Sequence, residues 1–531
     1  MSKFHCRDTA RLNKNKGELF IMQANNLEHL IAMIIYMAAV IGIGIFFAKR
    51  ANKNSEAYFL GGRTLGPWVS AFSAEASDMS GYLLMGMPGL AYWSGLADAT
   101  WTAIGLAVGT YLNWLITSKR LRRYSITVDA ITIPDFFSNR FHEKKKVLMT
   151  ISSLIIIIFF TPYAGSCLVA CGKLFSQLFG APYQTMVIIA AVFVLTYTFI
   201  GGFLAESASD FMQAVVMIVA LLFMLILGTA SAGGIGAVLK NAQSIPGFMS
   251  LLTSATPSET AAGVFGDPKN YGFLTVISTM AWGLGYFGMP QVLLRFMGIR
   301  SEKELTSSRR IATVWCVISM FCAVAIGVIG RALFFTTYTS NADAENVFIL
   351  TATTLVPPLL AGFVCAGILA ASISSSDSYL LISASAISKN VWQNLIHKGA
   401  SDKEIMNVSR VVLVGVTIVA AFMAMTPDSP IFVIVSFAWA GFGAAFGPLM
   451  IFSLFWRRIN LPGAIAGMVS GGVMVFIWKF LVKPLGGVFG IYELLPAFVV
   501  SSIVIIIVSL VTKEDTELEA EFDSVNAKSY N

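Results

Sequence analysis

The stretch SAEASDMSGYLLMGMPG, residues 73–89, places Asp78, Ser80 and Gly81 in the middle of an apolar segment. A carboxylate at the centre of a bilayer costs at least about 2.5–3.5 kcal/mol on insertion scales, which points to a function at that position. A second stretch, MAWGLGYFGMPQ at residues 280–291, concentrates glycine and proline in another apolar segment. Glycine weakens a helix and proline removes a backbone donor, so both stretches predict helices that are broken inside the membrane.

The composition around these stretches is that of a membrane protein. Of the 531 residues, 56% are hydrophobic and only 12% are charged, whereas ordinary soluble domains are roughly 25% charged. Apolar runs of about 20 residues recur, each long enough to cross a hydrocarbon core of roughly 30 Å. Because these runs lack the alternation of barrel strands, we predict an all-α integral membrane protein.

We expect about thirteen transmembrane helices in a single transporter domain, residues 28–511. Their approximate ranges are 28–48, 68–92, 97–117, 147–175, 183–202, 208–232, 271–297, 311–336, 355–387, 409–426, 430–456, 463–482 and 490–511. A polar N-terminal segment, residues 1–27, precedes the domain, and an acidic cytoplasmic tail, residues 512–531, follows it.

The two broken helices open two successive groups of five helices, residues 68–232 and 271–456. Interrupted segments at corresponding positions of two halves are the best sequence pointer to a transporter binding site. Each group holds an odd number of helices, so the second group enters the membrane in the opposite sense. The pattern therefore predicts a five-plus-five inverted repeat.

Lysine and arginine gather in loops of one parity, which predicts that these loops and the C-terminus are cytoplasmic and that the N-terminus is outside. The basic residues before Met22 conflict with this orientation, since they fall on the outer side. A start at Met22 in place of Met1 would remove the conflict, and the sequence leaves both starts open.

A third polar cluster, ISSSDS at residues 373–378, lies near the end of another apolar span. Its hydroxyls could complete a cation site with carbonyls freed near Asp78, since a hard monovalent cation wants several oxygens. Alternatively, the serines return hydrogen bonds to their own helix. Asp210 is a further carboxylate, which acts either near the cytoplasmic face or as a solvated helix cap.

Four long motifs give the chain a family resemblance. They are LGGRTLGPWVSAFSAEASDMSGYLLMGMPG, YTFIGGFLA, MAWGLGYFGMP and FAWAGFGAAFGP. In these motifs the sequence resembles the solute:sodium symporter family, from about residue 28 to residue 512. The resemblance implies a LeuT-like fold and sodium-coupled uptake of L-proline by alternating access, at the bacterial plasma (inner) membrane. It also implies Na⁺ as coupling ion, no organic cofactor, and no nucleic-acid partner.

The resemblance further implies the site residues. The sodium site comprises carbonyls and hydroxyls of Ala76, Met79, Ala371, Ser374 and Ser375, together with Asp78. The proline site comprises Ser80, Gly81, Tyr82, Tyr163, Trp282, Tyr286 and Pro290. Two residues, Arg63 and Asp210, match positions that serve transport and the sodium exit path.

Four residues depart from the family pattern and leave alternatives open. Tyr82 and Met289 replace tryptophan and glutamine in the expected pocket, which leaves another small amino acid, an osmolyte or a carboxylate as substrate. Glu75 and Asp377 replace a glycine and a serine, and add carboxylates that could alter sodium affinity or allow a second cation. The stoichiometry and the oligomeric state stay open.

Other classes of protein fit the sequence poorly. The stretch HEKKK at 142–146 lacks the second histidine of a zinc protease, and GLGYFG at 283–288 lies in a membrane span without a preceding strand. A channel needs a pore lined by rings of charge or carbonyls. The isolated carboxylates at helix breaks favour a symporter, with proline or a similar small zwitterion, sodium and the lipid bilayer as its partners.

Overall fold

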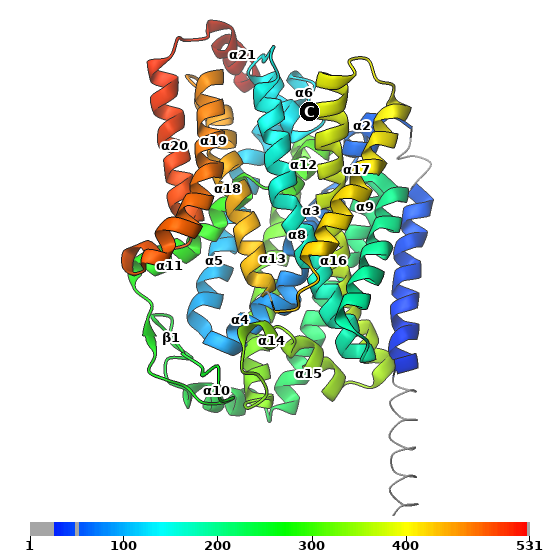
Figure 1. Ribbon diagram of the computed structural model, residues 1–531, viewed down its shortest axis with the longest axis vertical. Coiled ribbons are helices and arrows are strands. Elements are labelled where there is room, and N and C mark those ends of the chain that lie inside the picture. Colours follow the sequence, from blue (N-terminus) through cyan, green and yellow to red (C-terminus); the bar gives the residue numbers. More distant parts are fainter. Residues whose placement is uncertain (1–25, 48–52, 429, 528–531) are drawn as a thin grey trace, which may run out of the picture.

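The structure is a computed structural model that describes residues 26–47, 53–428 and 430–527. Most of its long helices run along the long axis of the molecule (Figure 1). Among the described residues, nine helices are long and apolar enough to cross a membrane: Asn26–Phe47, Val147–Phe179, Gly202–Ser231, Glu302–Leu333, Pro358–Ile396, Asp402–Met423, Ile431–Phe455, Leu461–Leu485 and Leu494–Val511. The prediction of an all-α membrane protein is confirmed. The question of the start, Met1 or Met22, lies outside the described residues.

The other four expected spans lie in shorter or interrupted helices. The second is formed by α3 (Pro67–Gly81), η2 (Tyr82–Gly86) and α4 (Met87–Ser94), and the third by α5 (Leu96–Leu112) and η3 (Asn113–Thr117). The fifth and sixth share α9 (Tyr183–Ser231), and the seventh is formed by α11 (Phe273–Met280), η4 (Ala281–Phe287) and α12 (Pro290–Gly298). The total of about thirteen crossings stays a prediction, because length and composition identify nine.

The remaining long helices complete the bundle. They are α8 (Val147–Phe179), α13 (Leu305–Leu333) after η5 (Glu302–Glu304), α16 (Pro358–Ser385) continued by η6 (Ala386–Ile396), α17 (Asp402–Met423), α18 (Ile431–Phe455), α19 (Leu461–Ile477) continued by η7 (Trp478–Val482), and α20 (Leu494–Val511). Short 3-10 turns η8 (Lys483–Leu485) and η9 (Gly487–Gly490) join the last two. The repeat boundaries, residues 68–232 and 271–456, stay a proposal that the matched breaks support.

Both predicted helix breaks are confirmed. In the first, the backbone of Ser80 takes φ 48° and ψ −169°, a conformation that costs a non-glycine residue on the order of 1–3 kcal/mol. In the second, the η4 turn ends at Phe287 and the extended Met289 precedes Pro290, which opens α12. Proline suits that first helical position because its missing N–H needs no partner there.

The broken helices pack closely against neighbouring helices at glycines. A Cβ added to Gly109 on α5 would lie 2.3 Å from the carbonyl oxygen of Gly283 in η4. One added to Gly81 would lie 2.6 Å from the Cβ of Ala170 on α8. Small residues let membrane helices approach this closely, so these glycines set how the broken helices are seated.

Short elements cover the two ends of the bundle (Figure 1). One end carries α2 (Ser55–Leu60), η1 (Gly61–Arg63), α6 (Ser118–Thr127), α7 (Ile133–Arg140) and α21 (Thr516–Ala527). The other carries α10 (Ile235–Gln243), the antiparallel pair β1 (Thr253–Ser254) and β2 (Lys269–Asn270), α14 (Asn341–Ala344) and α15 (Val347–Leu355). The expected acidic tail therefore contains a helix, α21, that the sequence analysis did not predict.

Candidate functional site

Oxygen atoms converge where the first break meets α16. The hydroxyl of Ser374 donates to the carbonyl of Ala76 at 2.8 Å, and the hydroxyl of Ser375 lies 3.3 Å from the same carbonyl. Ser374 also lies 3.1 Å from the carbonyl oxygen of Ala371. Besides Asp78, the predicted sodium site has five carbonyl and hydroxyl ligands, and four of these are thus brought together. The fifth, the carbonyl of Met79, accepts the backbone N–H of Tyr82 beyond the break.

These oxygens are buried and come from segments far apart in the chain. Ser374 and Ser375 have no exposed surface, and Ala76 has none either. Neutral carbonyl and hydroxyl oxygens suit a hard cation, which takes them in place of its water. The other prediction, that serines bond to their own helix, holds for Ser376, whose hydroxyl donates to the carbonyl of Ile373 at 3.2 Å.

Asp78 lies between the two breaks. Its carboxylate faces the side-chain amide of Gln291 on α12 at 3.5 Å, and its carbonyl faces the Tyr163 hydroxyl at 3.4 Å. The side chain is 4% exposed. Its contact runs to the second broken helix, so Asp78 joins the two breaks to each other.

Glu75 lies one turn before Asp78 and makes its contact on another helix. The hydroxyl of Thr110 on α5 donates to its Oε1 at 3.0 Å, while Oε2 has no partner among the described residues. Glu75 is 1% exposed. Its polar contact is therefore with α5.

Aromatic side chains fill the space beside the breaks. Tyr82 stacks on Trp282 with ring centroids 5.6 Å apart, and Phe432 packs against both rings. Trp439 donates from its indole to the Trp282 carbonyl at 2.8 Å and packs edge-on against Tyr286. These contacts join Tyr82 and Trp282 directly, and Trp439 links Trp282 to Tyr286.

Other predicted pocket residues lie close to this group, and several contributors were missed. The ring of Tyr163 packs on Tyr379 at 4.2 Å, and Tyr492 stacks on Trp282 at 5.2 Å. The residues predicted to form the pocket did not include Tyr379, Phe432, Trp439 or Tyr492. Only Trp439 had a signal, because it stands inside a motif shared with the family.

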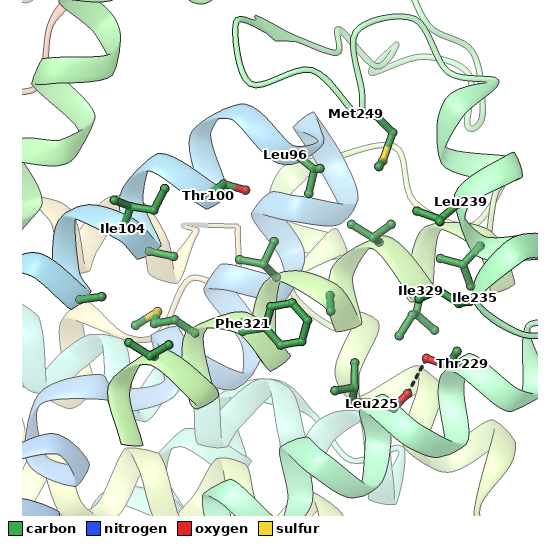
Figure 2. Close-up of a pocket in the computed structure, with 18 residues that line it drawn as sticks. Leu96, Thr100, Ile104, Leu225, Thr229, Ile235, Leu239, Met249, Phe321 and Ile329 are labelled. Carbon is green, nitrogen blue, oxygen red and sulfur yellow. Dashed lines mark hydrogen bonds between the residues drawn. The ribbon is translucent and has the colours of Figure 1, made fainter. Parts of the chain in front are cut away.

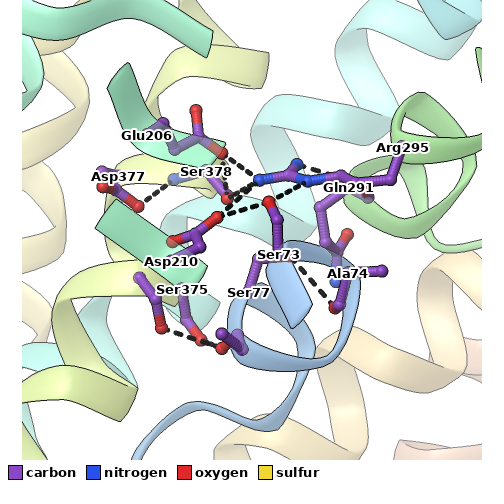
Figure 3. A network of polar contacts seen from close by, with 12 residues as sticks. Ser73, Ala74, Ser77, Glu206, Asp210, Gln291, Arg295, Ser375, Asp377 and Ser378 are labelled. Carbon is purple, nitrogen blue, oxygen red and sulfur yellow. Dashed lines mark hydrogen bonds and ion pairs between the residues drawn. The ribbon is translucent and has the colours of Figure 1, made fainter. Parts of the chain in front are cut away.

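A buried charge network lies near the sodium-ligand oxygens. The guanidinium of Arg295 on α12 pairs with Glu206 and with Asp210 at 3.0 Å, and donates to Ser73 at 2.9 Å (Figure 3). Ser378 on α16 accepts from Arg295 at 3.0 Å. Asp210 is fully buried, so the alternative that it is a solvated helix cap is wrong.

The same network contains more negative than positive groups. Asp377 accepts its neighbour's backbone N–H at 2.8 Å through Oδ1, while Oδ2 has no partner among the described residues. Glu206 and Asp210 pair with Arg295, and Asp377 is a third carboxyl group of the network that makes no ion pair with Arg295 in the described part of the chain (Figure 3). Arg295 and Glu206 were missed, although a charge inside an apolar segment is a functional signal by default.

Arg63 ties the α6 end of the bundle together. Its guanidinium donates to the carbonyls of Met297 at 2.9 Å and Ala130 at 2.7 Å, and to the Ser125 hydroxyl at 3.1 Å. It therefore joins η1 to the end of α12 and to the loop after α6.

A second buried ion pair lies toward the α14–α15 end. Glu345 pairs with Lys173 on α8 at 2.9 Å and accepts the first backbone N–H groups of α18, from Ile431 at 3.0 Å and Phe432 at 3.1 Å. Because Phe432 also covers Tyr82 and Trp282, Glu345 fixes one wall of the aromatic group.

A large apolar cavity lies elsewhere. It measures about 490 Å³ and is lined by side chains of α5, α9, α10 and α13, such as Ile104, Leu225 and Phe321 (Figure 2). None of the predicted site residues lines it. Its lining offers no charged group, so it does not belong to the polar site.

Broken helices, buried oxygens and a buried charge network together define a secondary transporter of the inverted-repeat class. The chain belongs to the sodium:solute symporter family, because the sequence model of that family matches residues 58–471. It is 39% identical to the sodium/proline symporter of Staphylococcus aureus (strain USA300 / TCH1516) over 515 residues, 95% of this chain and 97% of the relative. The protein of that name from strain bovine RF122 / ET3-1 is also 39% identical, covering 96% and 99%.

Solved structures show the same fold. A Na⁺-coupled sialic acid symporter in a substrate-bound outward-open state aligns with a TM-score of 0.74 at 18% identity, covering 92% of this chain and 98% of that one. Mhp1, a nucleobase-cation-symport-1 family transporter, aligns with a TM-score of 0.55 at 14% identity, covering 88% and 98%. The predicted LeuT-like class is confirmed by these two transporters.

Proposed function

We propose that this symporter couples the entry of Na⁺ to the uptake of L-proline or a similar small zwitterion by alternating access. The convergence of Ser374 and Ser375 on the carbonyl of Ala76, at a helix break, carries the proposal. The identity to relatives called sodium/proline symporters supports the choice of substrate.

In this proposal Na⁺ binds to the oxygens of Ala76, Met79, Ala371, Ser374 and Ser375. The carboxylate of Asp78 lies on the same broken segment and supplies negative charge in a region of low dielectric. The charge stabilises a bare cation more strongly there than it would in water. Sodium binding thereby fixes the first break in the conformation that the substrate needs.

The substrate would lie beside the cation. Its carboxylate would accept N–H groups at the start of the half-helix after Ser80 and Gly81, where the helix dipole is positive. Its ring would pack among the aromatic side chains of Tyr82, Tyr163, Trp282 and Tyr286, beside Pro290. Tyr82 and the buried Met289 set the shape of this pocket, which leaves another small solute of the same family as the alternative.

A transporter that works by alternating access needs a gate on each side of its binding site. The Glu345–Lys173 pair and the network around Arg295 lie on opposite sides of the pocket and suit these two gates. Glu345 and Lys173 join α14–α15 to α8, whereas Arg295 joins α12 to α9. We propose that the α14–α15 end is outside and the α6–α21 end is cytoplasmic, in a bacterial plasma membrane, because Arg120, Arg122 and Arg123 gather at the latter.

The driving force is sufficient for concentrative uptake. One charge crossing about 100 mV supplies about 2.3 kcal/mol, and a tenfold sodium gradient adds about 1.4 kcal/mol. The two together support roughly 500-fold accumulation of a net-neutral zwitterion per sodium ion.

The test is uptake of radiolabelled L-proline by the purified chain in liposomes, with and without an inward sodium gradient. We expect the gradient to raise initial uptake at least tenfold, and unlabelled proline to compete. Ser374→Ala should raise the sodium concentration for half-maximal uptake, while Ser376→Ala, whose hydroxyl bonds within its own helix, should not.

Two results would redirect the proposal. Proline uptake that ignores the sodium gradient would remove the coupling. Sodium-driven uptake of another amino acid, osmolyte or carboxylate without competition by proline would keep the coupling and replace the substrate.

A further inference from the structure

A cavity lined by lysines lies at the α6–α21 end of the molecule, away from the oxygen cluster. It measures about 390 Å³. Its lining residues are Lys144, Lys146, Lys389, Gln393, Asn394, Lys398 and Gly399. They come from the segment before α8 and from η6 with the loop after it, so the cavity joins two regions distant in sequence. No acidic residue lines it.

The charge of these four lysines is not neutralised by a direct ion pair. None of them makes an ion pair within 4.0 Å in the described part of the chain. Lys146 donates only to the neutral hydroxyl of Ser138, at 3.1 Å. Ammonium groups gathered around one cavity repel each other, so an anion in the cavity would be stabilised by all of them.

The acidic residues near the cavity are engaged elsewhere. Glu143 accepts the backbone N–H groups of Leu148 at 2.6 Å and Met149 at 3.2 Å, at the start of α8. Asp135 accepts the side-chain amide of Asn390 at 2.7 Å. Burial raises the pKa of the Asp135 carboxyl, and the nearby Lys389 and Lys146 oppose that rise. Asp135 therefore offsets part of the lysine charge, although it does not line the cavity.

Exposed apolar side chains lie next to the lining residues in the sequence. Val147 directly follows Lys146 and is 42% exposed, and Ile396 follows the lining residue Asn394 by two positions and is 63% exposed. Large apolar side chains exposed beside lysines mark the boundary between hydrocarbon and headgroups. A basic pocket at this depth between membrane helices suits the phosphate of a lipid headgroup.

We propose that the lysine cavity binds the phosphate headgroup of an anionic phospholipid. The lipid's chains would lie along Val147 and Ile396, while its phosphate would accept from the lysines and from the amides of Gln393 and Asn394. Bound there, the lipid would tie the start of α8 to η6, the continuation of α16. The proposal is independent of which solute the symporter carries.

The test is thermal unfolding of the purified full-length chain in detergent with three probes. They are dioctanoyl phosphatidylglycerol, dioctanoyl phosphatidylcholine, and inorganic phosphate at matched ionic strength. We expect only phosphatidylglycerol to raise the Tm. In the double variant Lys146→Gln/Lys389→Gln the apparent affinity for phosphatidylglycerol should fall roughly 25-fold, because each lysine near an anionic headgroup contributes about fivefold.

A matched control removes the same charge from Lys145, in the segment before α8, and from Lys403, at the start of α17. Lys145→Gln/Lys403→Gln changes two exposed lysines that do not line the cavity, and should bind phosphatidylglycerol as the wild type does. Equal losses in both double variants would overturn the proposal in favour of general attraction. If inorganic phosphate raised the Tm as much as phosphatidylglycerol does, the proposal that the ligand is a lipid would be wrong. If phosphatidylcholine raised the Tm equally, the cavity would not recognise the negative charge of the lipid.

The variants could lower stability without lipid. In that case Lys144→Gln/Lys398→Gln, which changes two exposed side chains of the lining, decides the question. A loss of phosphatidylglycerol affinity in this pair supports the site, and unchanged affinity overturns it.

Discussion

At the scale of single residues, Asp78 is the group on which sodium coupling should depend most. Asp78→Asn keeps the shape and the contact with Gln291 but removes the negative charge. A neutral amide cannot offset a cation in a region of low dielectric, so we expect sodium-stimulated uptake to be lost. Uptake by proteoliposomes, together with the amount of protein inserted, measures this.

The neighbouring carboxylate provides the control. Glu75→Gln retains an acceptor for Thr110, and its contact lies on α5, so sodium-stimulated uptake should persist in this variant. Normal sodium stimulation in Asp78→Asn would reject the role given to Asp78. Loss of sodium stimulation in Glu75→Gln would mean that both carboxylates serve the cation.

The charge network around Arg295 makes a second prediction at this scale. Removing the guanidinium with Arg295→Met leaves buried carboxylates without their partner, a change that typically costs about 3–5 kcal/mol of stability. Asp377→Ser removes a carboxylate with an unpartnered oxygen, so in the Arg295→Met background it should recover part of the lost stability.

Thermal unfolding of the two single variants and the double variant measures this coupling. Additive effects would show that Asp377 does not share the electrostatic environment of Arg295. The network itself was only partly predictable: Asp210 and Asp377 stood out in the sequence, whereas the pairing of α12 with α9 requires the tertiary structure.

At the scale of elements, the position of η4, the second helix break, depends on its backbone contact with α5. Gly109→Ala would bring a Cβ within 2.3 Å of the Gly283 carbonyl oxygen, and backbone cannot move aside cheaply. We expect lower thermal stability and at least a tenfold loss of uptake. Gly415→Ala, on a helix face with no atom within 4 Å, should leave both unchanged or gain up to about 1 kcal/mol.

If Gly109→Ala transported normally at wild-type stability, transport would not require the close packing of η4 against α5. The breaks themselves could be predicted, because glycine and proline act locally on the backbone. The close approach of Gly109 to Gly283 could not, since it joins helices about 170 residues apart that no local pattern relates.

Other elements escaped prediction for similar reasons. The β1–β2 pair is two residues long in each strand, too short for a periodic signal. The helix α21 did carry a signal, since its buried residues Leu518, Phe522 and Val525 follow helical spacing. Its acidic composition masked this pattern. The pocket aromatics Phe432 and Tyr492 stand in ordinary apolar surroundings, so only the fold shows their place.

At the scale of the whole molecule, α21 ties the chain's C-terminal part to the α6–α7 end. Glu521 accepts the Tyr124 hydroxyl at 2.8 Å and lies 2.8 Å from the ring nitrogen of His142. Burial raises the pKa of the Tyr124 hydroxyl, which therefore stays protonated as a donor. The guanidinium of the buried Arg140 lies over the rings of Tyr124 and Phe522.

This docking makes a prediction about proteolysis. Phe522→Ala removes the ring that covers Arg140 and should release α21. The chain around the exposed Lys513, between α20 and α21, then adapts more easily to trypsin, and cleavage there should be faster. Glu517→Ala alters an exposed residue of the same helix and should be cut at the wild-type rate. Cleavage rates are measured on the purified proteins from the masses of the fragments over time. Equal rates for the three proteins would show that packing of Phe522 does not hold α21.

The same cleavage also reports on the orientation of the molecule. If the α6–α21 end is cytoplasmic, Phe522→Ala should be cut after Lys513 in inside-out membrane vesicles and protected in right-side-out vesicles. The reverse pattern would invert the proposed topology, because the position of Lys513 fixes that of the whole end on which α21 packs. Positive charge on that end, from Arg457 and its neighbours, would then face outward, against the rule that lysine and arginine stay inside.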